Sequence, residues 1–214
     1  MFLCTGLSRQ LSILAACLAL AVVEHPRVLN AFEKETAGLS RLSVRLVDGR
    51  ARPLHAPKGG TLVLVFCSSE CPISNGYSPT LNALTSRFPG EKMTMLGLFV
   101  DPDLSDEAIG THAKEYLLTF PSASDRAGRL SKTLGIKVTP EVIVIDDQDR
   151  IRYRGRIDDQ YAARGKQNAN PVSHELRDAI EAVLAGRQVK RPHVPAVGCP
   201  LPEPVKEEAD RTPK

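Results

Sequence analysis

The sequence lacks any strong excess of one charge: its 214 residues carry a formal net charge of +3, with 25% charged and 42% hydrophobic residues. A balance this even gives no indication of a nucleic-acid-binding protein, which typically has an excess of basic residues. The sequence also has no tryptophan and no internal repeat. Its length suits one domain with a sizeable core better than two domains.

The sequence has no apolar run long enough to span a membrane comfortably. The longest such run near the N-terminus, Leu11–Val23, has 13 residues and follows a short segment with one arginine. That pattern is typical of a secretory signal peptide, which predicts removal of residues 1–31 and an exported, periplasmic or otherwise extracytoplasmic protein. Cleavage near Ala31 is one possibility and the 19–21 Ala-Leu-Ala site another. A third is a lipoprotein box that ends at Cys17, and only lipidation there would give a membrane partner.

Cysteine is scarce, with five in the chain and three after the predicted leader, namely Cys67, Cys71 and Cys199. Three cysteines are too few for a disulfide scaffold. In an oxidising compartment an odd number allows one disulfide and leaves one thiol over. This count therefore favours redox chemistry.

The stretch around Cys71 combines a buried strand with a helix start. Residues Thr61–Phe66 are apolar on both faces, as in a central strand of a sheet covered by helices. Pro72 suits the first position of a helix, which places Cys71 at a helix N-terminus. The helix dipole there would lower the thiol pKa, whereas the neighbouring Glu70 would raise it. We interpret Cys71 as a nucleophile.

The other predicted elements follow from periodicity and turn residues. A βαβ start should make strands 61–66 and 92–100 parallel neighbours. The segment 39–48 reads as a hairpin or edge strand. Four further helices are predicted: one over 73–88 that is kinked at Pro79 and ended by Pro89-Gly90, one capped by Ser105 that buries Ile109, Ala113, Tyr116 and Leu117, one over 126–134 closed by Gly135, and one capped by Ser173 that ends before Gly186. Three further strands are predicted: a short one over 121–124, one after Pro140, and an antiparallel one over 151–156.

The last segment, 187–214, contains six prolines and ends in charged residues. We expect no regular element there and an extended or partly disordered course over the surface. Cys199 lies in this segment. The predicted organisation is a signal peptide over 1–31, one domain over 32–186, and a Pro-rich tail over 187–214.

Three spacings together resemble the thioredoxin fold. Cys71 comes five residues after the strand-ending Phe66, Pro79 comes eight residues after Cys71, and Thr139-Pro140 precede a buried strand. More narrowly, residues 40–200 resemble the exported redoxin (AhpC/TSA-like, peroxiredoxin-related) family, to which YRGRIDDQY from Tyr153 and AVGCPL around Cys199 add similarity. The resemblance implies an α/β fold, a three-layer α/β/α sandwich with a central mixed sheet. It also implies a cis Pro140 beside the active sulfur and a thiol-dependent oxidoreductase.

The second cysteine of the usual Cys-x-x-Cys motif is absent, because Ser74 stands at its position. The standard dithiol cycle cannot run within that motif. Either Cys67 or Cys199 could instead resolve an intermediate on Cys71, and the sequence leaves both open. The expected partners are a thiol or disulfide protein, or an external thiol donor, and no cofactor is expected.

Peroxide reduction is a further possibility that the resemblance raises. Ser68 lies three residues before Cys71, where peroxiredoxins have Thr or Ser, and a small peroxide would then be the substrate. The arginine that peroxiredoxins place at the start of the later strand is replaced by Pro140, so Arg154 or Arg156 would have to supply the positive charge. The candidate catalytic residues are Cys71, Cys67, Cys199, Pro140 and Ser68.

Copper handling is the alternative from another class of function. Cys67 and Cys71 are four residues apart, as in copper-delivery proteins of the same fold, and soft thiolates suit Cu(I). Residues 137–146 contain no histidine. A histidine would therefore have to come from elsewhere in the chain.

Overall fold

A computed structural model describes residues 39–88 and 90–203 of the chain. The predicted signal peptide over 1–31, its alternative cleavage sites and Cys17 lie outside the described residues. The end of the predicted tail, 204–214, lies outside them as well.

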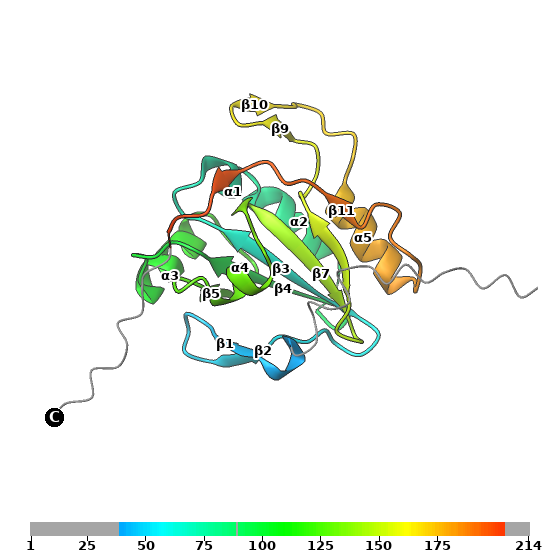
Figure 1. The fold of residues 1–214 in the computed structure, drawn as a ribbon, viewed down its shortest axis with the longest axis horizontal. Helices are drawn as coiled ribbons and strands as arrows, with labels where there is room; N and C mark the ends of the chain where they lie inside the picture. The colour runs from blue at the N-terminus through cyan, green and yellow to red at the C-terminus, as the bar shows by residue number, and fades with distance from the viewer. Residues whose placement is uncertain (1–38, 89, 204–214) are drawn as a thin grey trace, which may run out of the picture.

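A six-stranded mixed sheet forms the centre of the molecule (Figure 1). Its strands lie in the order β11-β8-β7-β3-β4-β5. Their bounds are β11 His193–Val194, β8 Ile151–Gly155, β7 Glu141–Asp146, β3 Thr61–Cys67, β4 Met93–Phe99 and β5 Ser122–Ser124. β3 pairs in parallel with β4 and antiparallel with β7, while β7 pairs antiparallel with β8. The predicted central strand, its parallel neighbour and the antiparallel strand after the turn are all confirmed.

Three further pairs of short strands lie outside this sheet. They are the β1–β2 hairpin of Ser43–Arg45 and Ala51–Pro53, the β9–β10 hairpin of Tyr161–Ala163 and Lys166–Gln167, and the pair of β6 Val138–Thr139 with β12 Cys199–Pro200. The first confirms the hairpin predicted in the N-terminal part of the domain. The β9–β10 hairpin projects from the body of the domain (Figure 1).

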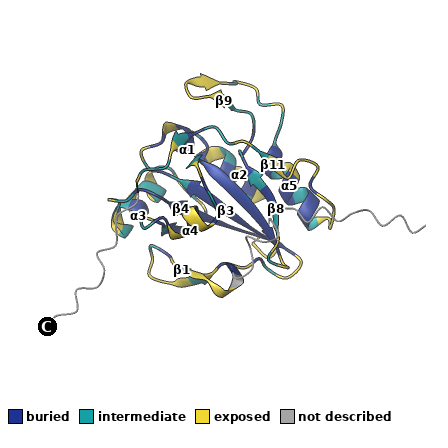
Figure 2. Ribbon diagram, in the orientation of Figure 1, coloured by how far each residue is buried: buried dark blue, intermediate teal, exposed yellow. Residues whose placement is uncertain are grey.

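Helices cover both faces of the sheet, which makes the fold a three-layer α/β/α sandwich as predicted (Figure 1). The helices are α1 Pro72–Gly76, α2 Ser78–Arg87, α3 Asp106–Glu115, α4 Arg129–Thr133 and α5 Glu175–Leu184, with a 3-10 turn at Leu39–Arg41. Alternate residues of β3 enter two separate apolar clusters: Val63 and Val65 pack with α1, α2 and α5, whereas Leu62 and Leu64 pack with α4. β4 is accordingly buried along its whole length, and β3 is buried up to Phe66 (Figure 2).

The helix predicted over 73–88, with a kink at Pro79, is two helices. α1 ends at Gly76 and α2 begins at Ser78, with Tyr77 between them. Pro79 therefore lies in the first turn of α2 rather than in a helix interior. A proline is tolerated in that turn because its missing N–H would have no helical partner there.

The prediction for the helix after Ser105 was right at its start and wrong at its end. The Ser105 hydroxyl accepts a hydrogen bond from the Ala108 amide and caps α3, and Ile109 is buried. Leu117, predicted to be buried, follows the helix with a φ of 53° and is 75% exposed. The positive φ turns the chain out of the helix, so the residue no longer lies on its buried face.

The predicted starts of two other helices were wrong. α4 begins at Arg129 rather than near Arg126, because the Asp125 carboxylate accepts hydrogen bonds from the amides of Leu130 and Ser131. The predicted cap of α5, Ser173, makes no capping hydrogen bond, and its hydroxyl donates to the Glu175 side chain instead. The helix stops at Gly135 and Gly186 are confirmed, since both have φ near 60°.

The expectation of no regular element after residue 187 was wrong. β11 pairs in parallel with β8, and β12 pairs antiparallel with β6. The tail therefore crosses the domain from the edge of β8 to β6, which directly precedes β7 (Figure 1). Pro192, Pro195 and Pro200 limit each pairing to two residues because proline has no N–H to donate to a ladder.

Candidate redox site

Cys71 lies in the turn that connects β3 to α1. Its amide donates to the Ser68 carbonyl oxygen at 3.3 Å, and its own carbonyl accepts from the Asn75 amide at 3.0 Å. Pro72 takes the first helical position, as the sequence indicated. The residue is only 1% exposed, so the surrounding chain covers the sulfur.

Cys199 and Thr139 flank the Cys71 sulfur. The Sγ atoms of Cys71 and Cys199 lie 2.9 Å apart, and both cysteines are free. The Cys71 Sγ also lies 3.1 Å from the carbonyl oxygen of Thr139, which accepts from the thiol. Thr139 precedes Pro140 through a cis peptide bond. The structure thus brings three sequence candidates together: Cys71, Cys199 and the Pro140 segment.

The acidity of Cys71 arises from its hydrogen bonds. Burial alone raises the pKa of this thiol, but hydrogen bonds from Cys199 and from the backbone and hydroxyl of Ser74 outweigh it, so the pKa lies below the ordinary value. The sequence argument relied on the dipole of a long helix. Because α1 has only five residues, these local donors replace that dipole. Ser74, read at first only as a missing cysteine, is thus a donor to the sulfur.

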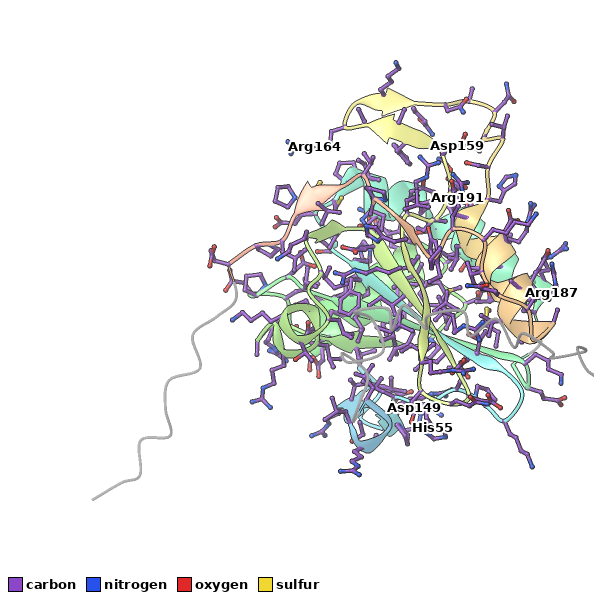
Figure 3. All side chains as sticks on the ribbon, turned by 45° about the vertical axis from the view of Figure 1, so that its right-hand side comes forward. His55, Asp149, Asp159, Arg164, Arg187 and Arg191 are labelled. Atoms are coloured by element: carbon purple, nitrogen blue, oxygen red, sulfur yellow. The ribbon has the colours of Figure 1, made fainter. Side chains whose placement is uncertain are left out.

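Cys199 has the opposite tendency. Burial, together with its hydrogen bond to Cys71 and the charge of that thiolate, raises the pKa of Cys199 to about 11. Arg164 lowers it in part through its charge. Arg164 lies in the turn of the β9–β10 hairpin (Figure 3). No pattern in the sequence indicated that the charge of this turn acts on the Cys199 thiol.

Cys67 has a different environment from the other two cysteines. It ends β3, and its thiol donates a long hydrogen bond of 3.7 Å to the Leu98 carbonyl oxygen. Burial of the sulfur, with the charges of Asp101 and Cys71, raises the pKa of this thiol far above its ordinary value, although the residue keeps some exposed surface. Such a thiol is a poor nucleophile at neutral pH.

Ser68 supports the loop that carries Cys71. Its hydroxyl donates to the Asp101 carboxylate at 2.5 Å and accepts from the Glu70 amide at 3.2 Å. The Ser69 amide donates to the second oxygen of the same carboxylate at 2.9 Å. Asp101 was not among the sequence candidates. Its place just after the predicted strand over 92–100, and before Pro102, was the available signal.

The arginines considered for the site are engaged in ion pairs. Arg154 pairs with Glu141 at 2.9 Å and also donates to the Gly135 carbonyl oxygen. Arg156 pairs with Glu175 at 2.6 Å. Both contacts join β8 to neighbouring elements.

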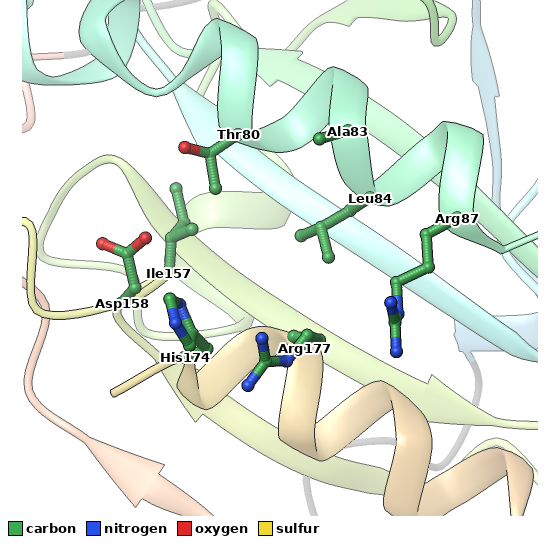
Figure 4. Close-up of a pocket in the computed structure, with 8 residues that line it drawn as sticks. All are labelled: Thr80, Ala83, Leu84, Arg87, Ile157, Asp158, His174 and Arg177. Atoms are coloured by element: carbon green, nitrogen blue, oxygen red, sulfur yellow. The ribbon is translucent and has the colours of Figure 1, made fainter. Parts of the chain in front are cut away.

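A cavity of about 310 Å³ lies between α2 and α5 (Figure 4), and none of the three cysteines lines it. Its lining residues are Thr80, Ala83, Leu84, Arg87, Ile157, Asp158, His174 and Arg177. Within residues 39–88 and 90–203, no group of three or more His, Cys, Asp or Glu residues could hold a metal ion. The same part of the chain contains no helix with the length and hydropathy of a membrane span.

Together, the mixed sheet, the cysteine before α1 and the cis proline facing it define a thioredoxin-like domain. The redoxin family model matches residues 40–167, more than half of the chain. The protein therefore belongs to the redoxin family. Cys199 lies beyond the matched segment.

Similar proteins agree with this assignment. The thiol-disulfide oxidoreductases ResA of Bacillus thuringiensis and Bacillus cereus are each 28% identical over 105 residues, which span 49% of this chain and 60% of theirs. The match thus covers less than two thirds of either relative. A hypothetical protein of Sinorhizobium meliloti superposes with a TM-score of 0.65 at 25% identity, covering 75% of this chain and 89% of that one. An uncharacterized conserved protein of Geobacillus kaustophilus superposes with a TM-score of 0.67 at 23% identity. That match covers 78% of this chain and 90% of the other.

Proposed function

We propose that this protein is an exported thiol-disulfide oxidoreductase in which Cys71 is the nucleophile and Cys199 the resolving cysteine. The observation that carries the proposal is the 2.9 Å distance between their sulfurs, at a site where the pKa of Cys71 is lowered. The relatives named thiol-disulfide oxidoreductases support the same class of reaction. Export rests on the N-terminal sequence.

The reaction begins when the Cys71 thiolate attacks one sulfur of a partner's disulfide. A Cys71–partner disulfide forms, and the partner's second sulfur leaves as a thiolate. The Cys199 thiolate then attacks the Cys71 sulfur, which releases the partner's first sulfur and leaves a Cys71–Cys199 disulfide. The partner gains two electrons and the protein loses two. An external thiol donor then reduces the Cys71–Cys199 disulfide, becomes oxidised itself and restores both thiols. Electrons stay on sulfur throughout, so no cofactor is needed.

The different pKa values of the two thiols suit this order of steps. At neutral pH Cys71 ionises first and attacks first. Once Cys71 is in a mixed disulfide, its negative charge is gone. The charge and the hydrogen bond that help to raise the pKa of Cys199 disappear with it, which makes Cys199 a better nucleophile when it is needed.

Cys199 suits the resolving role better than Cys67. A disulfide bond is about 2.05 Å long, so the Cys71–Cys199 pair needs a shift of only about 1 Å to form one. The Cys67 thiol bonds to a carbonyl oxygen of β4 instead and has a strongly raised pKa. We propose that the domain over 32–186 and the tail from residue 187 act together, because the tail supplies the second sulfur.

Mass spectrometry and turnover assays test this function. The oxidised wild-type protein should contain a Cys71–Cys199 disulfide. Cys71→Ser should reduce the rate of disulfide reduction by at least about a hundredfold, because it removes the nucleophile. Cys199→Ser should accumulate the mixed disulfide, and the matched control Cys67→Ser should retain turnover. A Cys67–Cys71 disulfide, or full turnover in Cys71→Ser, would refute the proposal.

A further inference from the structure

The β9–β10 hairpin, which we call the arm (residues 160–170), stands on the helix that follows the nucleophile. The Tyr161 ring at the base of the arm lies edge-on to the Tyr77 ring, with 5.1 Å between the ring centroids. Tyr161 also lies against Gly76, where a Cβ atom would come within 2.1 Å of its hydroxyl oxygen. The glycine at the end of α1 leaves room for this contact. The base of the arm is therefore placed beside α1, whose first residue follows Cys71.

Hydrogen bonds hold both ends of the arm. The Asn168 amide donates to the Gln160 carbonyl oxygen at 2.6 Å across its base. Just beyond the arm, the Asp159 carboxylate accepts from the amides of Val172 and Ser173 at 2.9 Å and 3.0 Å. These contacts determine the direction in which the arm leaves the domain.

The outer part of the arm adds little to the core. Tyr161 packs on the apolar cluster that contains Cys71, but the rest of both strands is exposed and the hairpin projects from the domain (Figure 1). Strands that bury so little apolar surface contribute little to the stability of the fold. A well-held projection beside a reactive site favours a role in recognition.

The charge of the arm is entirely positive. Arg164 and Lys166 are both exposed in and beside its turn, and residues 160–173 contain no aspartate or glutamate. The charge of Arg164 lowers the pKa of Cys199 against the effect of burial, so the field of the arm extends to the two sulfurs. Fixed charge beside a site raises the rate at which oppositely charged partners arrive.

Glu70 restricts where the partner's negative charge can lie. This exposed acid directly precedes Cys71 and repels an acidic side chain placed next to the attacked sulfur. Acidic side chains of the partner are therefore favoured some residues away from its cysteine, on the side of the arm.

We infer that the arm recruits proteins whose disulfides are flanked by acidic side chains, which pair with Arg164 and Lys166 while Cys71 attacks the sulfur. The inference rests on the proposed function and names the class of partner for its first step. A second copy of this chain is not such a partner, because residues 187–202, which surround Cys199, contain no acidic residue.

The test uses the reduced full chain carrying Cys199→Ser, so that Arg164 can no longer act through the Cys199 thiol. The probes are the end-blocked peptides EEACAEE, QQACAQQ and KKACAKK, each with its cysteine in a mixed disulfide with 2-thiopyridine. The Cys71 thiolate attacks the peptide sulfur, the S–S bond breaks, and the leaving thiolate takes a proton from water to give 2-thiopyridone, which is measured by its absorbance. Rates are divided by the rate of each peptide with 2-mercaptoethanol, which removes differences in intrinsic reactivity.

At low ionic strength the acidic peptide should react about tenfold faster than the neutral peptide, and the basic peptide more slowly than either. The same tail segment packs beside Cys71 in every reaction, so the cost of displacing it cancels in these ratios. The preference should nearly disappear in about 1 M salt, where charges are screened beyond about 3 Å.

The double variant Arg164→Gln/Lys166→Gln should reduce the preference for the acidic peptide to less than about twofold. The matched control Arg45→Gln/Lys132→Gln also removes one exposed arginine and one exposed lysine, from elements that pack on the other face of the sheet, and should keep the preference. The uncharged reagent 2,2′-dipyridyl disulfide should react at the same rate with both variants, since the arm has no charge on it to attract.

Equal corrected rates for the acidic and neutral peptides would overturn the class of partner while leaving the proposed function intact. An acidic preference that persisted in Arg164→Gln/Lys166→Gln would overturn the role of the arm. Failure of Cys71 to react with every peptide and with 2,2′-dipyridyl disulfide would instead remove the proposed function itself.

Discussion

At the scale of single residues, the two neighbouring thiols differ in acidity. Cys71 and Cys199 share one hydrogen bond, yet the pKa of the first is lowered and that of the second is raised to about 11. The Thr139 carbonyl oxygen can accept only from a protonated Cys71, whereas Cys199 and Ser74 can donate to its thiolate. The donors thus decide which sulfur ionises first.

The contribution of Cys199 can be measured by removing its thiol. In Cys199→Ala the pKa of Cys71 should rise, because the main hydrogen bond that lowers it is lost. Reaction of Cys71 with iodoacetamide, followed by mass spectrometry across pH, should show its midpoint at higher pH. The plateau rate of that profile reports how accessible the Cys71 sulfur is, and the midpoint reports its pKa. The effect of the variant on accessibility can therefore be separated from its effect on the pKa.

Cys199→Ser is the conservative counterpart, since its hydroxyl can still donate and should keep the midpoint low. Cys67→Ala is the control outside the pair and should leave the midpoint unchanged. If Cys199→Ala reacted with the wild-type midpoint, the hydrogen bond between the sulfurs would have no role in the acidity of Cys71.

At the scale of helices and strands, the tail is held at two points. β12 lies on β6 and β11 lies on β8, where the amides of Arg154 and Arg156 donate to the carbonyl oxygens of Pro192 and Val194. Gly155 permits the second attachment. Its φ is +142°, and a Cβ atom there would lie 1.8 Å from the Val194 carbonyl oxygen.

Gly155→Ala should therefore detach β11 from β8. The free energy of unfolding should fall by about 1–3 kcal/mol, because the methyl group overlaps backbone atoms and the φ angle strains an L residue. Hydrogen exchange should become faster at the Arg154 and Arg156 amides, and Cys71 should be alkylated faster as the tail loosens. Gly110→Ala in α3, where the added methyl would meet no atom within 4 Å apart from its own helix backbone and chain neighbours, should change neither the exchange rates nor the alkylation rate. Unchanged exchange in Gly155→Ala would show that β11 does not anchor the tail.

The sequence predicted the long elements well because their residues carry periodic patterns. β3, β4 and β7 are apolar on both faces, and α5 has one apolar face, so each was recognisable from its own residues. The two-residue strands of the tail have no period to detect. Their existence depends on β6 and β8, which lie far away in the sequence.

The candidate site was predictable where it depends on local motifs and not where it depends on long-range pairing. Cys71 and Pro140 follow from local motifs, and their closeness follows from the fold they predict. The sequence left Cys67 and Cys199 equally open as partners, because proximity of a tail residue depends on long-range pairing. Gly198, placed before the cysteine in a Pro-rich segment, was the one local sign that this backbone approaches another closely.

At the scale of the whole molecule, buried carboxylates tie the β7–β8 region to its neighbours. Glu175 accepts from Arg156 and Arg191, which links α5, β8 and the start of the tail. Asp146 ends β7 and accepts from Arg150 at 2.9 Å and from Arg152 at 3.0 Å. Both carboxylates are almost fully buried, so their charges depend on these partners.

The free energy of unfolding should therefore fall as the pH is lowered into the acidic range. Burial alone raises the pKa of Asp146, but hydrogen bonds from Arg150 and Arg152 outweigh it and lower the pKa below its ordinary value of 3.8. A depressed carboxylate pKa stabilises the folded state above 3.8, and this stabilisation is lost as the pH falls through the folded value. Asp146→Asn should lower the free energy of unfolding at pH 7 by about 1–3 kcal/mol, because charge-assisted hydrogen bonds are lost. The deficit should shrink in acid, where the wild-type carboxylate is protonated too.

Urea unfolding of both proteins from pH 7 down to pH 2.5 measures this convergence. Asp48→Asn is a matched control, since Asp48 also has an arginine partner and a lowered pKa but lies on an exposed hairpin. Solvent screens that pair, so its curve should follow the wild type closely. Parallel curves for Asp146→Asn and wild type over the whole range would mean that the charge of Asp146 does not contribute to stability, and that its loss acts only through packing.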